Sequence, residues 1–291
     1  MNIAVVGLGL IGGSLCKAIK KYTDNLILGI DSDSDTIKKA LSDNSIDKQI
    51  SSEQLSTADL TIVALYPLQT VDFIKNNAHL FKKNSIVIDI CGIKKYTVDK
   101  CTDILKELNV NFIGTHPMAG REFSGYDYSL ADLFLDASFI ITPREDSDEN
   151  SIETVRKLAE KIGFGKIVIS TPQKHDEVIA YTSQLAHIVS NAYVKSPALF
   201  ENNGFSAGSF LDLTRVAKLN ENMWTDLFMC NKAPLVKELE NIIEKLNEYL
   251  SALITDDSKL LYNLLKDGRE RKEKSAVIFP QKNKDGNFNG K

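Results

Sequence analysis

The fold is decided by the stretch Gly7-Leu8-Gly9-Leu10-Ile11-Gly12. A short apolar run precedes it and a segment typical of a helix follows it, which is the context that makes a G-x-G-x-x-G pattern informative. In such a unit Gly7 permits a tight turn, Gly9 lets a pyrophosphate approach the backbone, and Gly12 lets helix and strand pack closely. The amides of Leu10 and Ile11 are predicted to bind phosphate at the helix N-terminus. The stretch therefore predicts a dinucleotide-binding βαβ unit.

A carboxylate should follow the second strand of such a unit, about 20 residues beyond the glycines. Asp31 stands 19 residues after Gly12, at the end of the apolar run 26–30. We expect it to bind the ribose hydroxyls of NAD and to repel the 2′-phosphate of NADP, so that NAD is the predicted cofactor. A glycine-rich turn beside a capping Asp is the alternative interpretation. Leu65 and Pro67, which follow the next strand, are also assigned to the cofactor site.

Short apolar runs alternate with helical segments up to about residue 170. The predicted strands are 3–6, 26–30, 59–64, 85–90, 110–114, 138–142 and 166–170. The predicted helices between them are 10–22, 33–42, 67–80, 95–108 and 150–163. Strands that alternate with helices of this length imply a parallel sheet covered on both faces. We therefore predict an α/β fold, with a doubly wound parallel Rossmann sheet in residues 1–170.

The character of the sequence changes after Thr171. No strand is predicted from there to about residue 275, and apolar residues recur at helical spacing in three stripes, 178–192, 235–253 and 260–265. The stripes have too few partners within one chain, which favours a homodimer over packing on the same chain. We predict an all-helical substrate and dimerisation domain at 171–280 and a disordered polar tail at 281–291.

Composition excludes several classes of protein. The 291 residues include 35 basic and 39 acidic side chains, for a net charge of -4, so a broad basic face for nucleic acid is not expected. No apolar run reaches the roughly 18 residues that a membrane span needs, and the N-terminus lacks the pattern of a signal peptide. The four cysteines are scattered without zinc spacing, so we expect a cytoplasmic protein with no metal site.

Two side chains are placed for chemistry beyond the cofactor. His116 follows the predicted strand 110–114, and ligands of open α/β sheets bind beyond the carboxyl ends of the strands. A neutral histidine there can take a hydroxyl proton as hydride leaves the same carbon; the alternative is a histidine that bonds its own loop. Arg215 stands in an apolar segment and could bind a carboxylate in bidentate fashion, or else pair with Asp212 at the surface.

Taken together, these segments resemble the prephenate dehydrogenase family. The resemblance rests on GLGLIGGS from Gly7, GTHPMAGREFSG at Gly114–Gly125, HDEVIAYTSQLAH at His175–His187, SFLDLTRVA at Ser209–Ala217, and Met223-Trp224. It covers the chain to about residue 275. It implies a Rossmann domain, a helical dimerisation domain, and NAD-dependent oxidative decarboxylation of prephenate to 4-hydroxyphenylpyruvate in tyrosine biosynthesis.

The resemblance also implies roles for four residues. His116 matches the histidine that bonds the ring hydroxyl of prephenate, and Arg215 matches the arginine that binds a substrate carboxylate. His187 matches a second histidine of the substrate site, although from its position alone it could lie on a solvated helix face. Glu122 matches an acidic residue at the mouth of the site. These four are the predicted catalytic residues.

The sequence departs from the family pattern at two positions. Gly92 stands where many members have a serine in the loop after the fourth strand, and Gln184 stands where some have a histidine. Three other functions are open: an arogenate dehydrogenase, another Rossmann-plus-helical hydroxyacid dehydrogenase, or a dinucleotide-sensing protein without turnover. A sensor needs neither His116 nor Arg215, so these two residues favour an enzyme.

Overall fold

The structure of the chain, a computed structural model, describes residues 1–279. The chain divides into two compact units, Met1–Leu235 and Val236–Lys291. The domain boundary predicted near residue 170 stays a prediction, and the tail predicted at 281–291 lies outside the described residues. Among residues 1–279, none of the helices combines the length and apolar character that a membrane crossing needs.

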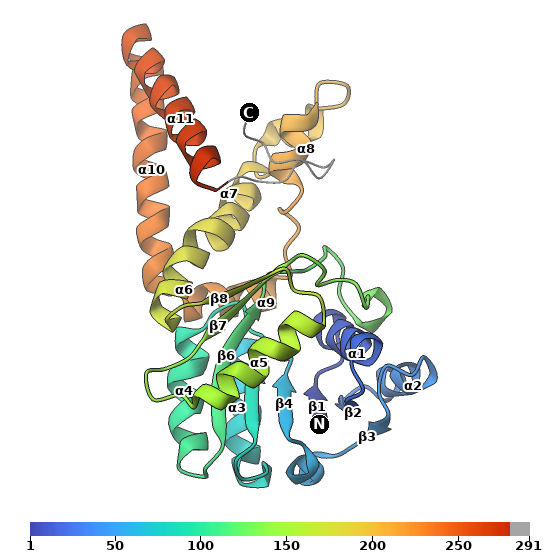
Figure 1. Cartoon of the computed structure of the whole chain (residues 1–291). Helices are drawn as coiled ribbons and strands as arrows, with labels where there is room; N and C mark the ends of the chain where they lie inside the picture. The colour runs from blue at the N-terminus through green and yellow to red at the C-terminus, as the bar shows by residue number, and fades with distance from the viewer. Residues whose placement is uncertain (280–291) are drawn as a thin grey trace. The chain divides into compact units, whose positions relative to one another are not determined.

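The first unit is built on an eight-stranded sheet with the order β3-β2-β1-β4-β5-β6-β7-β8 (Figure 1). The strands are β1 (Asn2–Val6), β2 (Leu26–Ile30), β3 (Lys48–Gln49), β4 (Leu60–Val63), β5 (Ile86–Asp89), β6 (Asn111–Pro117), β7 (Ser138–Thr142) and β8 (Lys166–Ile169). Every predicted strand is confirmed. Successive strands are added on one side of β1 up to β3 and on its other side from β4 onward. Open α/β sheets bind ligands at such a switch point, here between β1 and β4.

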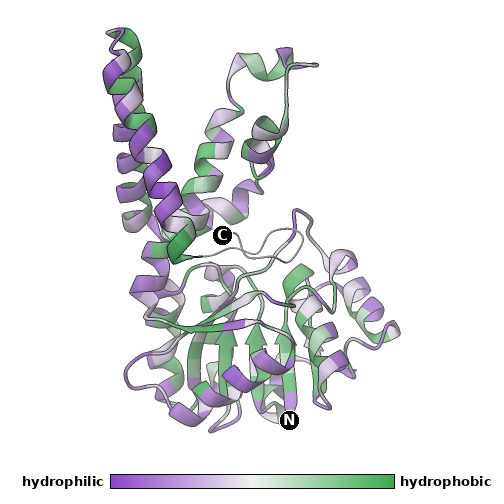
Figure 2. Cartoon of the chain, turned by 45° about the horizontal axis from the view of Figure 1, so that its top comes forward, coloured by the Kyte–Doolittle hydropathy of each residue, from purple (hydrophilic) through white to green (hydrophobic). Residues whose placement is uncertain are grey.

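Helices cover both faces of this sheet because its strands are apolar on both sides. They are α1 (Leu10–Tyr22), α2 (Ser34–Ser42), α3 (Pro67–Asn77), α4 (Lys95–Lys106) and α5 (Glu149–Lys161). On β1, Ile3 and Val5 pack with residues of α1, α2 and α5, whereas Ala4 packs with residues of α3 and α4. Figure 2 shows the strands as a largely hydrophobic layer between helices with polar outer faces. The predicted α/β fold with a Rossmann sheet is confirmed.

Strand direction departs from the prediction in one place. Six of the seven strand pairings are parallel, but β7 runs antiparallel to β6. The segment that joins the two strands holds a short 3₁₀ turn, η3 (Tyr126–Tyr128), and no α-helix, whereas parallel neighbours are usually joined through a helix. Pairing with β7 also extends β6 past Gly114, so that His116 lies on the strand opposite Ile140. His116 therefore gains the rigidity of a sheet.

Helices follow the sheet in the rest of the first unit, as predicted. They are α6 (Pro172–Ile179), a π-helical turn η4 (Ala180–Leu185), α7 (Ala186–Tyr193), a 3₁₀ turn η5 (Pro197–Glu201), α8 (Gly208–Thr214) and α9 (Glu221–Cys230). The apolar stripe predicted over 178–192 forms only in part, because Val178 and Thr182 are exposed while Leu185 is buried. A π turn holds more residues than an α turn, and this changes the face on which later residues lie.

Two long helices, α10 (Lys232–Ile254) and α11 (Ser258–Ile278), make up most of the described part of the second unit. Several of their large apolar side chains are exposed: Ile243, Leu246, Leu250, Leu253, Ile254, Tyr262 and Leu265. Single apolar side chains are common on protein surfaces, but this many on two helices are not. Such a set is expected where the helices pack on a second copy of the chain.

Candidate active site

The glycine-rich turn has the geometry that its motif predicts. Gly7 has a φ of 88°, and a Cβ at this position would lie 2.6 Å from the carbonyl oxygen of Ala64. A Cβ on Gly12 would lie 1.9 Å from the carbonyl oxygen of Gly7, so no side chain fits there. A Cβ on Gly9 would meet no described atom within 4 Å, which leaves this backbone open to a ligand. Two glycines thus close the turn and the third leaves it accessible.

The N-terminus of α1 is free to bind an anion. Among the described residues no side chain caps this helix at Gly9, and its first turn holds no acidic residue. The amides of Leu10 and Ile11 lie in that turn, where the helix dipole favours negative charge. Leu65 borders the turn, because its Cδ2 atom is 2.9 Å from the Cβ position of Gly7. Pro67 is buried in the first turn of α3, as a proline at that position can be.

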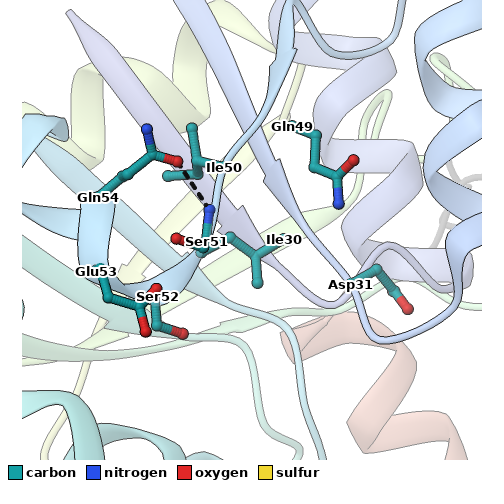
Figure 3. Close-up of a pocket in the computed structure, with 8 residues that line it drawn as sticks. All are labelled: Ile30, Asp31, Gln49, Ile50, Ser51, Ser52, Glu53 and Gln54. Atoms are coloured by element: carbon teal, nitrogen blue, oxygen red, sulfur yellow. Dashed lines mark hydrogen bonds between the residues drawn. The ribbon is translucent and has the colours of Figure 1, made fainter.

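Asp31 holds the turn and borders a hollow. Its Oδ2 accepts a hydrogen bond from the Leu8 amide at 2.6 Å, and its Oδ1 accepts one from the Asp33 amide at 2.9 Å. The hollow, of about 520 Å³, is lined by Ile30, Asp31, Gln49, Ile50, Ser51, Ser52, Glu53 and Gln54 (Figure 3). Two carboxylates, those of Asp31 and Glu53, therefore line it, which is unfavourable for an added phosphate. The wall from 49 to 54 was not predicted, because it carries no motif.

His116 lies in a buried chain of polar side chains. Its Nδ1 is 2.9 Å from Nε2 of His175, and Nδ1 of His175 is 2.7 Å from Oδ1 of Asp176. Burial lowers the pKa of His116 well below 6.5, and the neighbouring His175 and Lys94 lower this pKa further. Burial also lowers the pKa of His175. Both rings are therefore neutral at neutral pH.

The surroundings of His116 are rigid on one side and open on the other. Lys94 is fully buried, and its Nζ donates to Oδ2 of Asp89 at 2.5 Å and to the carbonyl of Thr115 at 2.6 Å. These bonds join β5 to the strand that carries His116. On the open side, a Cβ built on Gly92 would lie 3.9 Å from Nε2 of His116. The loop after β5 thus faces His116, as the sequence predicts.

Arg215 and Glu122 come together at the surface. Nη1 of Arg215, at the end of α8, donates to Oε1 of Glu122, in the loop after β6, at 2.7 Å. The two side chains are 62% and 55% exposed. The sequence offered Asp212 as the surface partner of Arg215, but in the structure the partner is Glu122. Two residues that the family resemblance singled out separately are thereby in contact.

His187 lies near Arg215 and is packed on an aromatic ring. Its ring centroid is 4.1 Å from that of Trp224, and its Nδ1 is 2.8 Å from the carbonyl oxygen of Ser183. Burial lowers the pKa of His187, and the positive charge of Arg215 contributes to the same shift. His187 is thus not on a solvated face. In the described chain no hydrogen bond joins His187 or Arg215 to His116, so the predicted residues form two groups.

Sequence reasoning missed His175, Asp176 and the buried amides around them. His175 is 59 residues from His116 in the chain, and its only signal was its place at the start of a family motif. Asn231 donates from Nδ2 to the carbonyl of Asp176 at 2.9 Å and to Oε1 of Gln184 at 2.7 Å. Gln184, one of the departures from the family pattern, therefore helps to hold η4 against the end of α9. Residues 1–279 contain no group of three His, Cys, Asp or Glu side chains that could hold a metal ion.

Comparisons with known proteins agree with this arrangement. Residues 15–177 match the nucleotide-binding domain of prephenate dehydrogenase, and residues 171–267 match its dimerization domain. Prephenate dehydrogenase of Bacillus subtilis is 30% identical over 95% of this chain and 78% of its own length.

Two solved structures are also similar. One is prephenate dehydrogenase from A. aeolicus in complex with hydroxyphenyl propionate and NAD+ (TM-score 0.84, 28% identity, 94% of this chain and 98% of that one). The other is Synechocystis arogenate dehydrogenase (TM-score 0.81, 26% identity, 94% of this chain and 99% of that one).

Proposed function

Because the chain belongs to the prephenate dehydrogenase family, we propose that it oxidises prephenate with NAD⁺ and releases 4-hydroxyphenylpyruvate and carbon dioxide, a step of tyrosine biosynthesis. The observation that carries this proposal is His116, a neutral histidine at the carboxyl end of β6, on the same edge of the sheet as the glycine-rich turn that follows β1. A neutral histidine accepts a proton without a prior ionisation step. A protein that only sensed the dinucleotide would have no use for such a group.

The cofactor of the proposed reaction is NAD⁺. The glycine turn, the uncapped N-terminus of α1 and the match to a nucleotide-binding domain support a dinucleotide at this edge. The carboxylates of Asp31 and Glu53 favour NAD⁺ over NADP⁺, because both would repel a 2′-phosphate. The A. aeolicus relative, whose structure holds NAD+, supports the same choice. When bound, the nicotinamide ring supplies the hydride acceptor.

The residues of this chain have separate tasks in the proposed reaction. His116 accepts the hydroxyl proton at Nε2 while hydride leaves the same ring carbon. The electron pair of the breaking bond to the ring carboxylate enters the ring, which becomes aromatic as carbon dioxide departs, and the resulting phenolate oxygen takes the proton back from His116. No further group is needed for that loss, so the protein has to place and recognise its substrate. Arg215 binds a carboxylate of the substrate, His187 contacts the substrate beside it, and Glu122 lies at the mouth of the site.

Arogenate is the second candidate substrate. It differs from prephenate by an amine on the side chain, and the exposed carboxylate of Glu122 beside Arg215 is a natural partner for an ammonium group. The arogenate dehydrogenase of Synechocystis is among the similar structures. Glu122 is therefore the observation that favours arogenate as the second candidate substrate.

The family match and the exposed helices also support a homodimer. The second matched domain is a dimerization domain, and α10 and α11 carry exposed leucines. All four cysteines are free thiols, which fits the cytoplasmic location that we propose.

The proposal is tested by following NADH formation with prephenate, arogenate and a 3-hydroxy acid, each with NAD⁺ and with NADP⁺. We expect turnover of prephenate with NAD⁺, with 4-hydroxyphenylpyruvate and carbon dioxide released in equal amounts. A higher kcat/KM with arogenate would transfer the assignment to that substrate. Turnover of the 3-hydroxy acid alone, or of none of the three, would contradict the proposal. Equal use of NADP⁺ would contradict the role of Asp31.

A further inference from the structure

The hydrogen bonds that link His116, His175 and Asp176 run in one donor-to-acceptor direction, which the groups themselves impose. This chain of side chains ends on Asp176, and an ionised carboxylate can only accept hydrogen bonds. Oδ1 of Asp176 also accepts from the amide of Lys94 at 2.7 Å, and Oδ2 accepts from the amide of Lys95 at 2.9 Å. These amides open helix α4, whose dipole favours a negative charge at that end. Both carboxylate oxygens are therefore fixed by the backbone.

This anchor determines which nitrogen of each ring carries a proton. Nδ1 of His175 lies 2.7 Å from a carboxylate oxygen, so Nδ1 must be the donor. A neutral imidazole has one donor and one acceptor, and Nε2 of His175 is therefore the acceptor. Nε2 lies 2.9 Å from Nδ1 of His116, so Nδ1 of His116 must donate to it. The remaining nitrogen of His116, Nε2, is left with a bare lone pair.

That bare nitrogen is the one on the open side of the ring. Nε2 of His116 is 3.9 Å from the Cβ position of Gly92, and glycine places no side chain there. Within residues 1–279, His175 is the one side chain that hydrogen-bonds the His116 ring. Its side chain is fully buried and that of Asp176 is 3% exposed, so water does not compete for these bonds. The orientation and tautomer of His116 thus depend on His175.

We propose that His175, anchored by Asp176, is a positioning residue that holds His116 in the tautomer whose bare Nε2 faces the substrate. This inference rests on the proposed function. In the reaction the substrate O–H bond breaks and an N–H bond forms at Nε2 of His116. The resulting imidazolium keeps its Nδ1 hydrogen bond to His175, and no proton needs to pass along the chain. If the ring were free to adopt the other tautomer, Nε2 would carry a proton and could not act as a base.

Two substitutions at one position test this role. In His175→Gln the amide oxygen can still accept from His116 and the amide nitrogen can still donate to Asp176, so the direction of the chain is kept. In His175→Leu both bonds are lost. His79→Leu, at an exposed histidine outside the site, is the matched control.

We expect His175→Leu to lower kcat by about 10²-fold or more, with KM for prephenate and the affinity for NAD⁺ unchanged. His175→Gln should recover activity to within about tenfold of the wild type, the value of one neutral hydrogen bond. Wild-type kcat in His175→Leu would overturn the proposal. The proposal would also be overturned if both variants lost NAD⁺ affinity and melting temperature in proportion to their loss of kcat. That pattern indicates a purely structural residue.

The tautomers themselves can be measured without substrate. Histidine nitrogen chemical shifts from NMR on the free wild-type enzyme, assigned with His175→Gln and His116→Asn, should show both His116 and His175 protonated on Nδ1. A proton on Nε2 of His116 would overturn the proposal. If the wild type oxidises neither prephenate nor arogenate, the proposed function fails, whereas this measurement still decides the tautomer.

Discussion

The two groups of predicted residues differ in how firmly the protein holds them. His116 is fixed from behind by side chains that are almost completely buried, whereas Arg215 and Glu122 are more than half exposed. A buried, fully bonded group keeps its geometry before the substrate arrives. An exposed ion pair contributes only about 0–1 kcal/mol, so a substrate carboxylate can replace Glu122 at low cost. The proton acceptor is thus preformed, while the charged contact is exchangeable.

Changing the preformed group should have the largest effect. His116→Asn keeps the approximate shape but removes the base, and loss of a general base costs about 10²–10⁴ in rate. We expect kcat to fall by this factor while NAD⁺ affinity, measured by fluorescence titration, stays the same. Activity within a few-fold of the wild type would make His116 a structural residue of β6 and would remove the contrast between the two groups.

Changing the exchangeable group should act on KM instead. Arg215→Lys keeps the charge but loses the planar fork, and hydrogen bonds to charged groups are worth about 1.5–3 kcal/mol. We therefore expect KM for prephenate to rise by about tenfold or more with little change in kcat. Glu122→Gln is the matched control, and it should leave KM for prephenate equal or lower. If Arg215→Lys lowers kcat and leaves KM alone, Arg215 belongs with the reacting atoms.

A smaller effect is expected at Gly92, where this chain departs from its family. The φ of Gly92 lies outside the left-handed region, and an added Cβ would be at ordinary contact distance, 3.6 Å from Leu227 and 3.9 Å from His116. The position therefore accepts a side chain. Gly92→Ser would add a hydroxyl near Nε2 of His116, and one hydrogen bond of about 0.5–1.5 kcal/mol changes kcat/KM by less than about tenfold. Severe loss of activity or of melting temperature would contradict this.

The smallest effect is expected from mild acid. Protonated His116 cannot accept a proton, but burial lowers its pKa well below 6.5, so the ring stays neutral as the pH falls through 6.5. The profile of kcat/KM should be level there and decline only at lower pH. An acid limb centred at pH 6.5 would mean that His116 is solvated.

Stability should respond to mild acid before activity does. The pKa values of His116, His175 and His187 are all lowered in the folded chain from 6.5. The unfolded chain therefore binds more protons as the pH falls below that value, and the free energy of unfolding declines. Melting temperatures across the same pH range measure this decline, and His175→Gln should reduce it.

The fold was more predictable than the site, for a physical reason. Buried strands leave apolar runs in the sequence, so β1 and β4 were found, whereas the polar pair Lys48-Gln49 of β3 left no such signal. His116 and the glycine turn were found because strand ends and turns have local signatures. The contact between His116 and His175 arises from packing of distant segments, and no pattern in either segment encodes it.

The π turn at Ala180–Leu185 determines how far the residues after it are rotated about the helix axis. Each residue of an α-helix advances the chain by about 100° around the axis, and a π turn inserts one extra residue into that count. Removing a single residue here would restore an uninterrupted α-helix and rotate everything after it by about that angle. Asp176, on α6 before the turn, would keep its hydrogen bonds to the start of α4, while His187 would turn away from Trp224. The length of this one turn thus sets which two faces of the helix serve the two halves of the site.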